Sequence, residues 1–264
     1  VMAGSLMMAE AKRSGALLLP IDSEHNAMFQ CLPDHYRTGE SIPGLKQLLL
    51  TCSGGPFRTW SARKMAKATV REACAHPTWS MGRKISVDSA TLMNKGLELI
   101  EASHLFQVPE SVIDVVIHPE STVHSMVEFT DGSILAQLGS PDMRIPIAHA
   151  LGFPERLSID VERLSLSRLA SLNFEAVDHA RFPALGLARA ACDAGDDRAI
   201  VLNAANEVAV SAFLEGRLSF AKIIALVSEC LNRMPQQPIS SLEDVLAIDA
   251  RCRRSALDWM QEHL

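Results

Sequence analysis

Residues 112–139 read VIDVVIHPESTVHSMVEFTDGSILAQLG and carry the clearest β-strand pattern of the chain. Runs of the β-strand type cover 112–117, 122–130 and 133–139, with turn residues between them. Asp131-Gly132 joins the last two runs and is a dipeptide typical of a tight hairpin. The stretch therefore predicts part of a sheet in which at least two strands run antiparallel.

On the N-terminal side of this stretch the pattern mixes strands with helices. Short apolar runs at 16–21 and 47–51 are typical of buried parallel strands. Helical spacing covers 61–74 and then 89–106, where Asp88 or Ser89 is the expected N-cap. The first part of the chain is therefore expected to hold a mixed sheet with helices.

On the C-terminal side the β-signals stop after Asp178. Helical runs follow at 182–194, 198–215, 219–233 and 241–262. The predicted fold class is an α/β (α+β) catalytic domain with a mixed sheet, followed by an all-α C-terminal helical bundle. The expected domains are a catalytic, metal- and substrate-binding and dimerisation domain at 1–152, a linker at 153–178 and the bundle at 179–264.

Composition narrows the class of protein. The chain has 264 residues, of which 48% are hydrophobic and 21% charged, so it is expected to form an ample globular core. The net charge of −6 argues against nucleic acid as a partner, and no apolar run approaches the roughly 20 residues that span a bilayer. The six cysteines form no C-x-x-C pair, which favours reduced thiols in a cytosolic protein.

Asp22 and Glu24 stand two residues apart at the end of the predicted strand 16–21. In an extended backbone both carboxylates point the same way and can face one cation. A capped turn, in which Asp22 begins the next helix, explains the same residues.

Glu98 lies on the predicted helix 89–106, four residues after Asn94 and on the same face. By itself it reads as a solvated helix residue. Together with Asp22 and Glu24 it offers oxygen ligands that suit Mg²⁺ or Mn²⁺.

Several groups could bind a phosphate. Glycines after a strand allow backbone N–H groups to approach an anion, as at Ser53-Gly54-Gly55. Ser89, Asn94 and Lys95 add donors around one helix start, where the helix dipole favours anions. A tight turn and a surface lysine are the plainer explanations of these features.

The segment 76–87 is expected to be an ordered but mobile loop. Trp79 lies in it, between His76 and Gly82. It either acts as a lid that excludes water from a substrate or anchors the loop as a buried aromatic residue. The residues alone leave both interpretations open.

At these segments the chain closely resembles the 1-deoxy-D-xylulose 5-phosphate reductoisomerase family. The resemblance rests on stretches that cover nearly the whole chain: LLLPIDSEHNAMFQCL, SGGPF, HPTWSMGRKISVDSATLMNKGLELIEA, IHPESTVHSMVEF, LAQLGSPDMRIPIAHA and LNAANEVAVSAFL. The run from His76 to Glu98 is long enough to be highly specific.

The resemblance implies a role for each matching residue. Asp22, Glu24 and Glu98 match the metal ligands, which with His76 form the expected catalytic set. The expected substrate-binding residues, which bind the sugar hydroxyls and the phosphate, are Ser23, Glu24, Ser53, His76, Trp79, Ser89, Asn94, Lys95 and Glu98. The expected cofactor contacts are Met81, Gly82 and Met143.

The resemblance also implies a reaction. A divalent metal (Mn²⁺, Mg²⁺ or Co²⁺) and NADPH would serve a carbon–carbon rearrangement and a reduction that turn 1-deoxy-D-xylulose 5-phosphate into 2-C-methyl-D-erythritol 4-phosphate, in isoprenoid precursor synthesis by the non-mevalonate pathway. The expected partner is a second copy in a homodimer. The expected compartment is the bacterial cytoplasm, with the plastid stroma as the other option.

Two departures from the family pattern stand out. Cys52 replaces a glycine expected in T-G-S-G-G-P, which would strain the turn if that position needs a positive φ. The chain also begins after the glycine-rich NADPH-binding domain of the family, so we expect a fragment with little or no activity by itself.

Two alternatives remain open from the residues. One is a folded dimerisation module with a vestigial site, in which the strands of 112–139 pair with a second copy. The other is a metal-dependent sugar-phosphate isomerase or aldolase without a redox step, which needs the same carboxylates.

Overall fold

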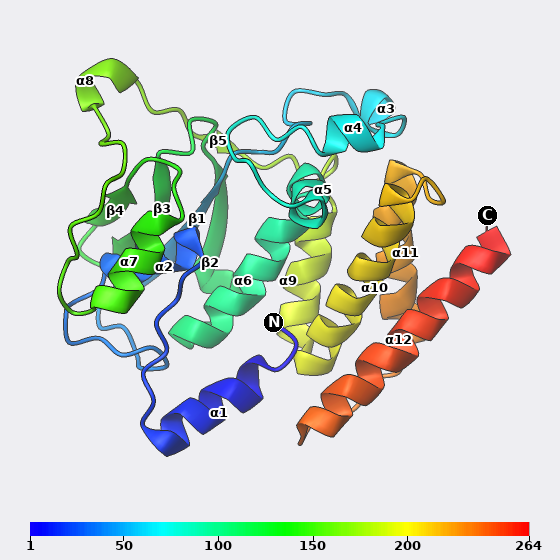
Figure 1. Ribbon diagram of the computed structural model, residues 1–264. Coiled ribbons are helices and arrows are strands. Elements are labelled where there is room, and N and C mark those ends of the chain that lie inside the picture. Colours follow the sequence, from blue (N-terminus) through cyan, green and yellow to red (C-terminus); the bar gives the residue numbers. More distant parts are fainter. Residues whose placement is uncertain (264) are drawn as a thin grey trace. The chain divides into compact units, whose positions relative to one another are not determined.

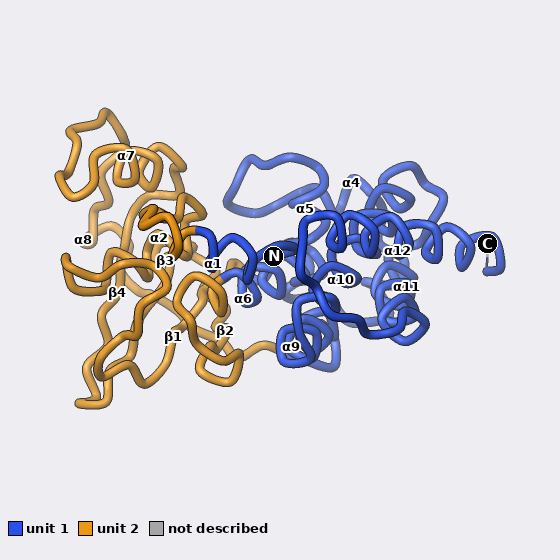
Figure 2. The backbone as a smooth tube through the Cα atoms, turned by 90° about the horizontal axis from the view of Figure 1, so that it is seen from below, with its two compact units in different colours: residues 1–10, 54–101, 178–264 blue, residues 11–53, 102–177 orange. Residues whose placement is uncertain are grey.

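The computed structural model describes residues 1–263, and their contacts divide them into two compact units (Figure 2). Unit 1 comprises 1–10, 54–101 and 178–264, of which 264 is not described, and unit 2 comprises 11–53 and 102–177. The chain thus crosses between the units several times. The domain ranges expected from sequence, 1–152, 153–178 and 179–264, stay a prediction.

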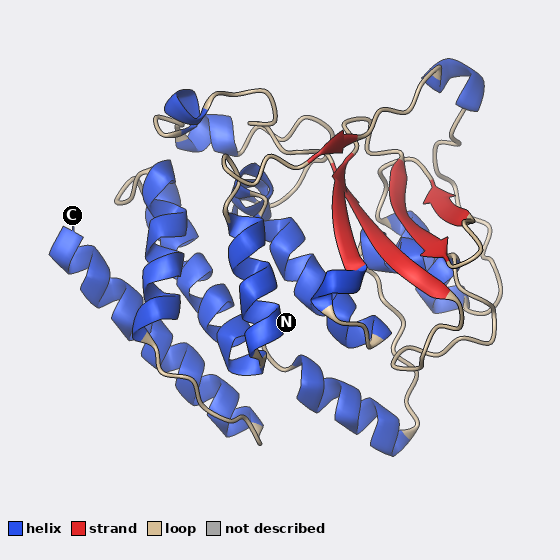
Figure 3. Cartoon of the chain, turned by 180° about the vertical axis from the view of Figure 1, so that it is seen from behind, coloured by secondary structure: helices blue, strands red, loops and turns tan. Residues whose placement is uncertain are grey.

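Unit 2 is built on a mixed sheet with the strand order β4-β3-β1-β2-β5 (Figure 3). The only parallel pairing among its described strands joins β1 and β2, while β3, β4 and β5 pair antiparallel with their neighbours. The strands are β1 (Leu45–Cys52), β2 (Ile113–Ile117), β3 (Val123–Phe129), β4 (Ile134–Leu138) and β5 (Glu175–Ala176).

The core of this sheet lies along β1, where Leu48 and Leu50 are fully buried. Helix α2 (Ser23–Gln30) packs across β3, β4 and β1, and α7 (Arg144–Gly152) packs beside α2 (Figure 3). The 3₁₀ helix η1 (Glu110–Val112) leads into β2, and α8 (Leu166–Leu169) precedes β5.

Unit 1 is mainly helical, and α10 (Asp196–Leu214) is its central helix (Figure 1). Its residues from Asp197 to Phe213 are mostly buried, and it packs against α5, α9, α11 and α12. The helices of this unit are α3 (Ala62–Met65), α4 (Val70–Ala73), α5 (Arg83–Thr91), α9 (Ala184–Ala194), α11 (Phe220–Arg233) and α12 (Leu242–His263). Helices α1 (Gly4–Ser14) and α6 (Met93–Phe106) each have residues in both units.

The predicted fold class is confirmed: a mixed sheet with helices is followed by an all-helical C-terminal part. The strands of 112–139 and the four C-terminal helices form close to where the residue patterns place them. Among the described residues, none of the helices combines the length and the apolar character that crossing a bilayer requires.

Three local predictions are wrong. The run 16–21 forms no strand, because Pro20 has no N–H for a sheet, and the Pro20 carbonyl instead accepts the Asn26 amide at 2.8 Å. The helix expected at 61–74 is broken, because Thr69 and Glu72 form a capping box that starts α4.

The third wrong prediction concerns the helix expected to begin at Asp88 or Ser89. Helix α5 starts earlier, at Arg83, with Gly82 as its N-cap. Its last residue is Thr91, and the C-cap Leu92, with a left-handed φ of 61°, separates it from α6. Asp88 and Ser89 therefore lie inside α5, near its C-terminal end.

Candidate functional site

The first two candidate ligands lie at the start of α2. Asp22 is the N-cap, and its Oδ1 accepts the backbone N–H of Glu24 at 3.3 Å. The Ser23 hydroxyl donates to Glu24 Oε2 at 2.5 Å. The helix start, not an extended backbone, therefore fixes both carboxylates. Because a carboxylate has two oxygens, capping does not prevent Asp22 from binding a cation.

Glu98 is a buried carboxylate on α6, with 4% of its surface exposed. Asn94 Nδ2 donates to Glu98 Oε1 at 2.5 Å, and the Lys95 ammonium pairs with Glu98 Oε2. Lys95 is itself only 3% exposed. The interpretation of Glu98 as a solvated helix residue is therefore wrong, and Asn94 and Lys95 hold Glu98 rather than lying free on the surface.

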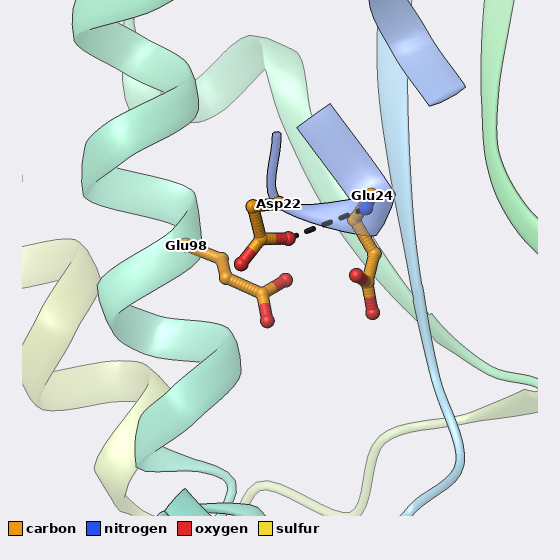
Figure 4. Close-up of side chains that lie close together, drawn as sticks. All are labelled: Asp22, Glu24 and Glu98. Atoms are coloured by element: carbon orange, nitrogen blue, oxygen red, sulfur yellow. Dashed lines mark hydrogen bonds between the residues drawn. The ribbon is translucent and has the colours of Figure 1, made fainter. Parts of the chain in front are cut away.

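The three carboxylates come together (Figure 4). One oxygen from each of Asp22, Glu24 and Glu98 lies within 4.8 Å of the others. Three carboxylates and the ammonium of Lys95 leave two negative charges, which a divalent cation would neutralise. Oxygen ligands of this kind fit Mg²⁺ or Mn²⁺.

A glycine turn after β1 lies against α5. Gly54 and Gly55 adopt φ values of +81° and +67°, which L-residues with a side chain rarely adopt. A Cβ on Gly55 would lie 2.4 Å from the backbone carbonyl oxygen of Ser89. The glycine is therefore required for this approach of the turn to the Ser89 backbone in α5, and Ser89 as a residue is half-buried.

Cys52 does not strain this turn. It is the last residue of β1, where it pairs with Ile117. Its carbonyl accepts the backbone N–H of His118 at 2.7 Å. It is absent from the described residues with positive φ, so the expected strain does not arise.

His76 anchors the loop that contains Trp79. Its Nδ1 accepts the backbone N–H groups of Thr78 at 3.2 Å and of Trp79 at 2.9 Å. Both hydrogen bonds require Nδ1 without a proton, and partial burial of the ring lowers the pKa of His76. Trp79 and Met81 are half-exposed, and Gly82 is exposed with open space where a Cβ would be.

Met143 precedes α7 as its N-cap residue and is 39% exposed. The expected contact of Met143 with the cofactor stays a prediction.

Two residues of interest were given no functional role from the sequence. His25 is fully buried on α2, with Nδ1 3.9 Å from Asp22 Oδ1. Asp88 is 1% exposed and contacts Lys84 and Asn206. The signal for Asp88 is weak, since only its apolar neighbours Val87 and Ala90 indicate burial.

Family models match most of the chain. The model of the 1-deoxy-D-xylulose 5-phosphate reductoisomerase C-terminal domain matches residues 18–106, and that of the DXP reductoisomerase C-terminal domain matches residues 138–255. The chain is 54% identical to 1-deoxy-D-xylulose 5-phosphate reductoisomerase of Pseudomonas putida (strain W619) over 263 residues, and 55% identical to that of Stutzerimonas stutzeri (strain A1501) over 260. It spans 66% of the length of both relatives, and they cover 100% and 98% of this chain.

Solved structures give the same result. The Zymomonas mobilis reductoisomerase in complex with NADPH superposes with a TM-score of 0.90 at 49% identity, covering 98% of this chain and 65% of its own. A DOX-P reductoisomerase in complex with NADPH, fosmidomycin and magnesium superposes with a TM-score of 0.93 at 48% identity. The match covers 98% of this chain and 67% of the solved chain.

We expect Gly55→Ala to destabilise the protein by more than about 2 kcal/mol. The alanine would have to adopt a left-handed φ, and its Cβ would clash with the Ser89 backbone. Urea unfolding measures the difference. The matched control is Gly186→Ala on an exposed face of α9, where a Cβ meets nothing within 4 Å. This control should stabilise the protein by up to about 1 kcal/mol. Equal midpoints for the two variants would contradict the close approach of the turn to α5.

The loop anchored by His76 should respond to pH. The pKa of His76 in the folded protein is lowered. The two hydrogen bonds to Nδ1 therefore stabilise the loop fully above the ordinary pKa of about 6.5, and this stabilisation is lost as pH falls through the lower pKa of the folded protein. The backbone amide resonance of Trp79 should shift with that titration. In His76→Asn, whose side-chain oxygen accepts the same N–H groups but does not titrate, the resonance should stay constant. A constant resonance in the wild-type protein would refute the anchoring.

Proposed function

The chain belongs to the 1-deoxy-D-xylulose 5-phosphate reductoisomerase family, and we propose that it supplies the metal- and substrate-binding residues of such an enzyme. The reaction would convert 1-deoxy-D-xylulose 5-phosphate to 2-C-methyl-D-erythritol 4-phosphate with NADPH. The observation that carries the proposal is the cluster of Asp22, Glu24 and Glu98, with Lys95 against Glu98.

We assign a divalent cation, Mg²⁺, Mn²⁺ or Co²⁺, to Asp22, Glu24 and Glu98. Such a cation supplies Lewis-acid polarisation of substrate oxygens. Asn94 and Lys95 hold the Glu98 carboxylate in one orientation, so that the ligand needs no reorganisation. The charge balance of the cluster and the magnesium in two solved relatives support this assignment.

The substrate would be held at both ends. Ser23, whose hydroxyl contacts Glu24, lies at the metal end and would bind a sugar hydroxyl. Ser53, Ser89 and His76 would bind the phosphate, with Gly54 and Gly55 between the two serines allowing close approach of backbone N–H groups. Binding energy at the phosphate would orient the reacting carbons.

Trp79 would cover the bound substrate and exclude water. Met81 and Met143 would lie near the nicotinamide of NADPH, which would supply the hydride, and Gly82 would contact the same cofactor. The NADPH in two solved relatives supports a role for this cofactor. Neither a vestigial dimerisation module nor an aldolase without a redox step is favoured by the matches. We propose the bacterial cytoplasm as the compartment, because the matched relatives named above come from bacteria.

The proposed assembly is a homodimer joined at the edge of the sheet. Strand β4 is an edge strand, and its Ile134 and Leu135 are 53% and 48% exposed. An exposed apolar edge of this kind is suited to pairing with a second copy. Light scattering should give twice the monomer mass, and Leu135→Asp should shift the protein toward monomer. A monomeric wild-type protein would contradict the proposal.

The metal assignment is tested by Glu98→Gln, which keeps the shape and removes the charge. We expect Mn²⁺ affinity to fall by at least about tenfold in calorimetric titrations of the full chain. The matched control is Glu101→Gln on the same helix, outside the cluster, which should bind Mn²⁺ as the wild type does. Equal affinities for Glu98→Gln and Glu101→Gln would refute the assignment.

A further inference from the structure

The bend between α5 and α6 is held by the Thr91 side chain and by a backbone hydrogen bond. The Thr91 hydroxyl donates to the Asp88 carbonyl at 3.1 Å and accepts the backbone N–H of Met93 at 3.2 Å. The backbone N–H of Leu92 donates to the Ser89 carbonyl at 3.2 Å. The position of Asp88 therefore sets the position of Ser89 and the start of α6.

Asp88 is held in turn from two helices. Its Oδ2 pairs with Lys84 on α5 at 2.7 Å, and its Oδ1 accepts Asn206 Nδ2 on α10 at 2.8 Å. Asp88 is 1% exposed, whereas the Lys84 side chain is 43% exposed and the Asn206 residue is fully buried. The bond from Asn206 is thus the rigid one, because it is shielded from water and its donor cannot move into solvent.

The hydrogen bond to Asp88 explains why a buried amide, rather than an apolar side chain, suits position 206. A carboxylate only accepts hydrogen bonds, so the amide must present its nitrogen to Asp88. Its Oδ1 is buried and has no hydrogen-bond partner among residues 1–263. A buried amide with an unsatisfied oxygen is costly, and an apolar residue would fill the same space without that cost.

Ser89 has little freedom to move on its other side. The turn at Gly55 lies so close that a single added carbon would meet the Ser89 carbonyl oxygen. A shift of α5 away from α10 would therefore change the contact between the Ser89 carbonyl and the turn. The carbonyl would either clash with the turn or move away from it, depending on the direction of the shift. Ser89 and the glycine turn are the groups that the proposed function assigns to the phosphate.

We propose that Asn206 is a positioning residue, which acts through Asp88 to hold Ser89 in the orientation that receives a phosphate group. The inference rests on the proposed function, because it takes Ser89 to be a phosphate ligand. It assigns to the central helix of the C-terminal part a role in substrate binding, although that helix contributes none of the predicted site residues.

The test is calorimetric binding of inorganic phosphate to the full chain. Asn206→Asp keeps the volume and places a second carboxylate against Asp88. We expect about tenfold weaker phosphate binding, comparable to Ser89→Ala. The double variant should bind no more weakly than Ser89→Ala, because both changes act on one contact. The exchange Asp88→Asn with Asn206→Asp, which swaps donor and acceptor, should restore binding to within about twofold of the wild type.

The control is Val201→Ala, a fully buried residue on the same helix whose carbonyl accepts Cys252 Sγ on α12. It should lower the melting temperature and leave phosphate affinity unchanged. If Asn206→Asp does not fold, Asn206→Ala takes its place with the same expected order of affinities.

Three results would overturn the inference. Wild-type affinity in Asn206→Asp beside weakened binding in Ser89→Ala refutes the positioning role alone. Additive losses in the double variant show that Asn206 does not act through Ser89. Wild-type affinity in Ser89→Ala refutes the phosphate assignment of the proposed function, and the positioning role with it.

Discussion

The buried carboxylate of Glu98 is the constraint on which the candidate site depends. A charge that is 4% exposed loses most of its hydration, and only close partners offset that loss. Asn94 and Lys95 supply them from the preceding turn of the same helix. Because Lys95 is buried as well, removing either charge would deprive the other of a close ion-pair partner. The contacts from Asn94 and Lys95 within α6 therefore orient Glu98, and Asp22 and Glu24 complete an oxygen cluster that one dication would neutralise.

The C-terminal helices hold the segments that carry these residues. A Cβ on Gly96 of α6 would lie 2.6 Å from the Cβ of Ala188 on α9, so the two helices approach at a point where neither has a large side chain. Helix α10 contacts α5 through the hydrogen bond from Asn206 to Asp88. The C-terminal helices therefore contact the helices on both sides of the bend at Leu92.

Elements with regular periodicity could be predicted from the sequence, and those set by distant contacts could not. The strands of 112–139 and the four last helices follow clear patterns of spacing. The break at Leu92 has no local signal, because leucine seldom adopts a left-handed φ. The candidate ligands were predicted as residue types, whereas the burial of Glu98 depends on packing. The contact between Asp88 and Asn206 joins residues 118 apart in sequence, which no local pattern reveals.

Anomalous diffraction from crystals soaked in Mn²⁺ tests the central claim most directly, since it locates the cation without reference to activity. The account predicts one manganese peak at about 2.1–2.2 Å from an oxygen of each of Asp22, Glu24 and Glu98, with Lys95 still against Glu98. A peak bound elsewhere, or a Glu98 carboxylate turned away from the metal, would contradict it.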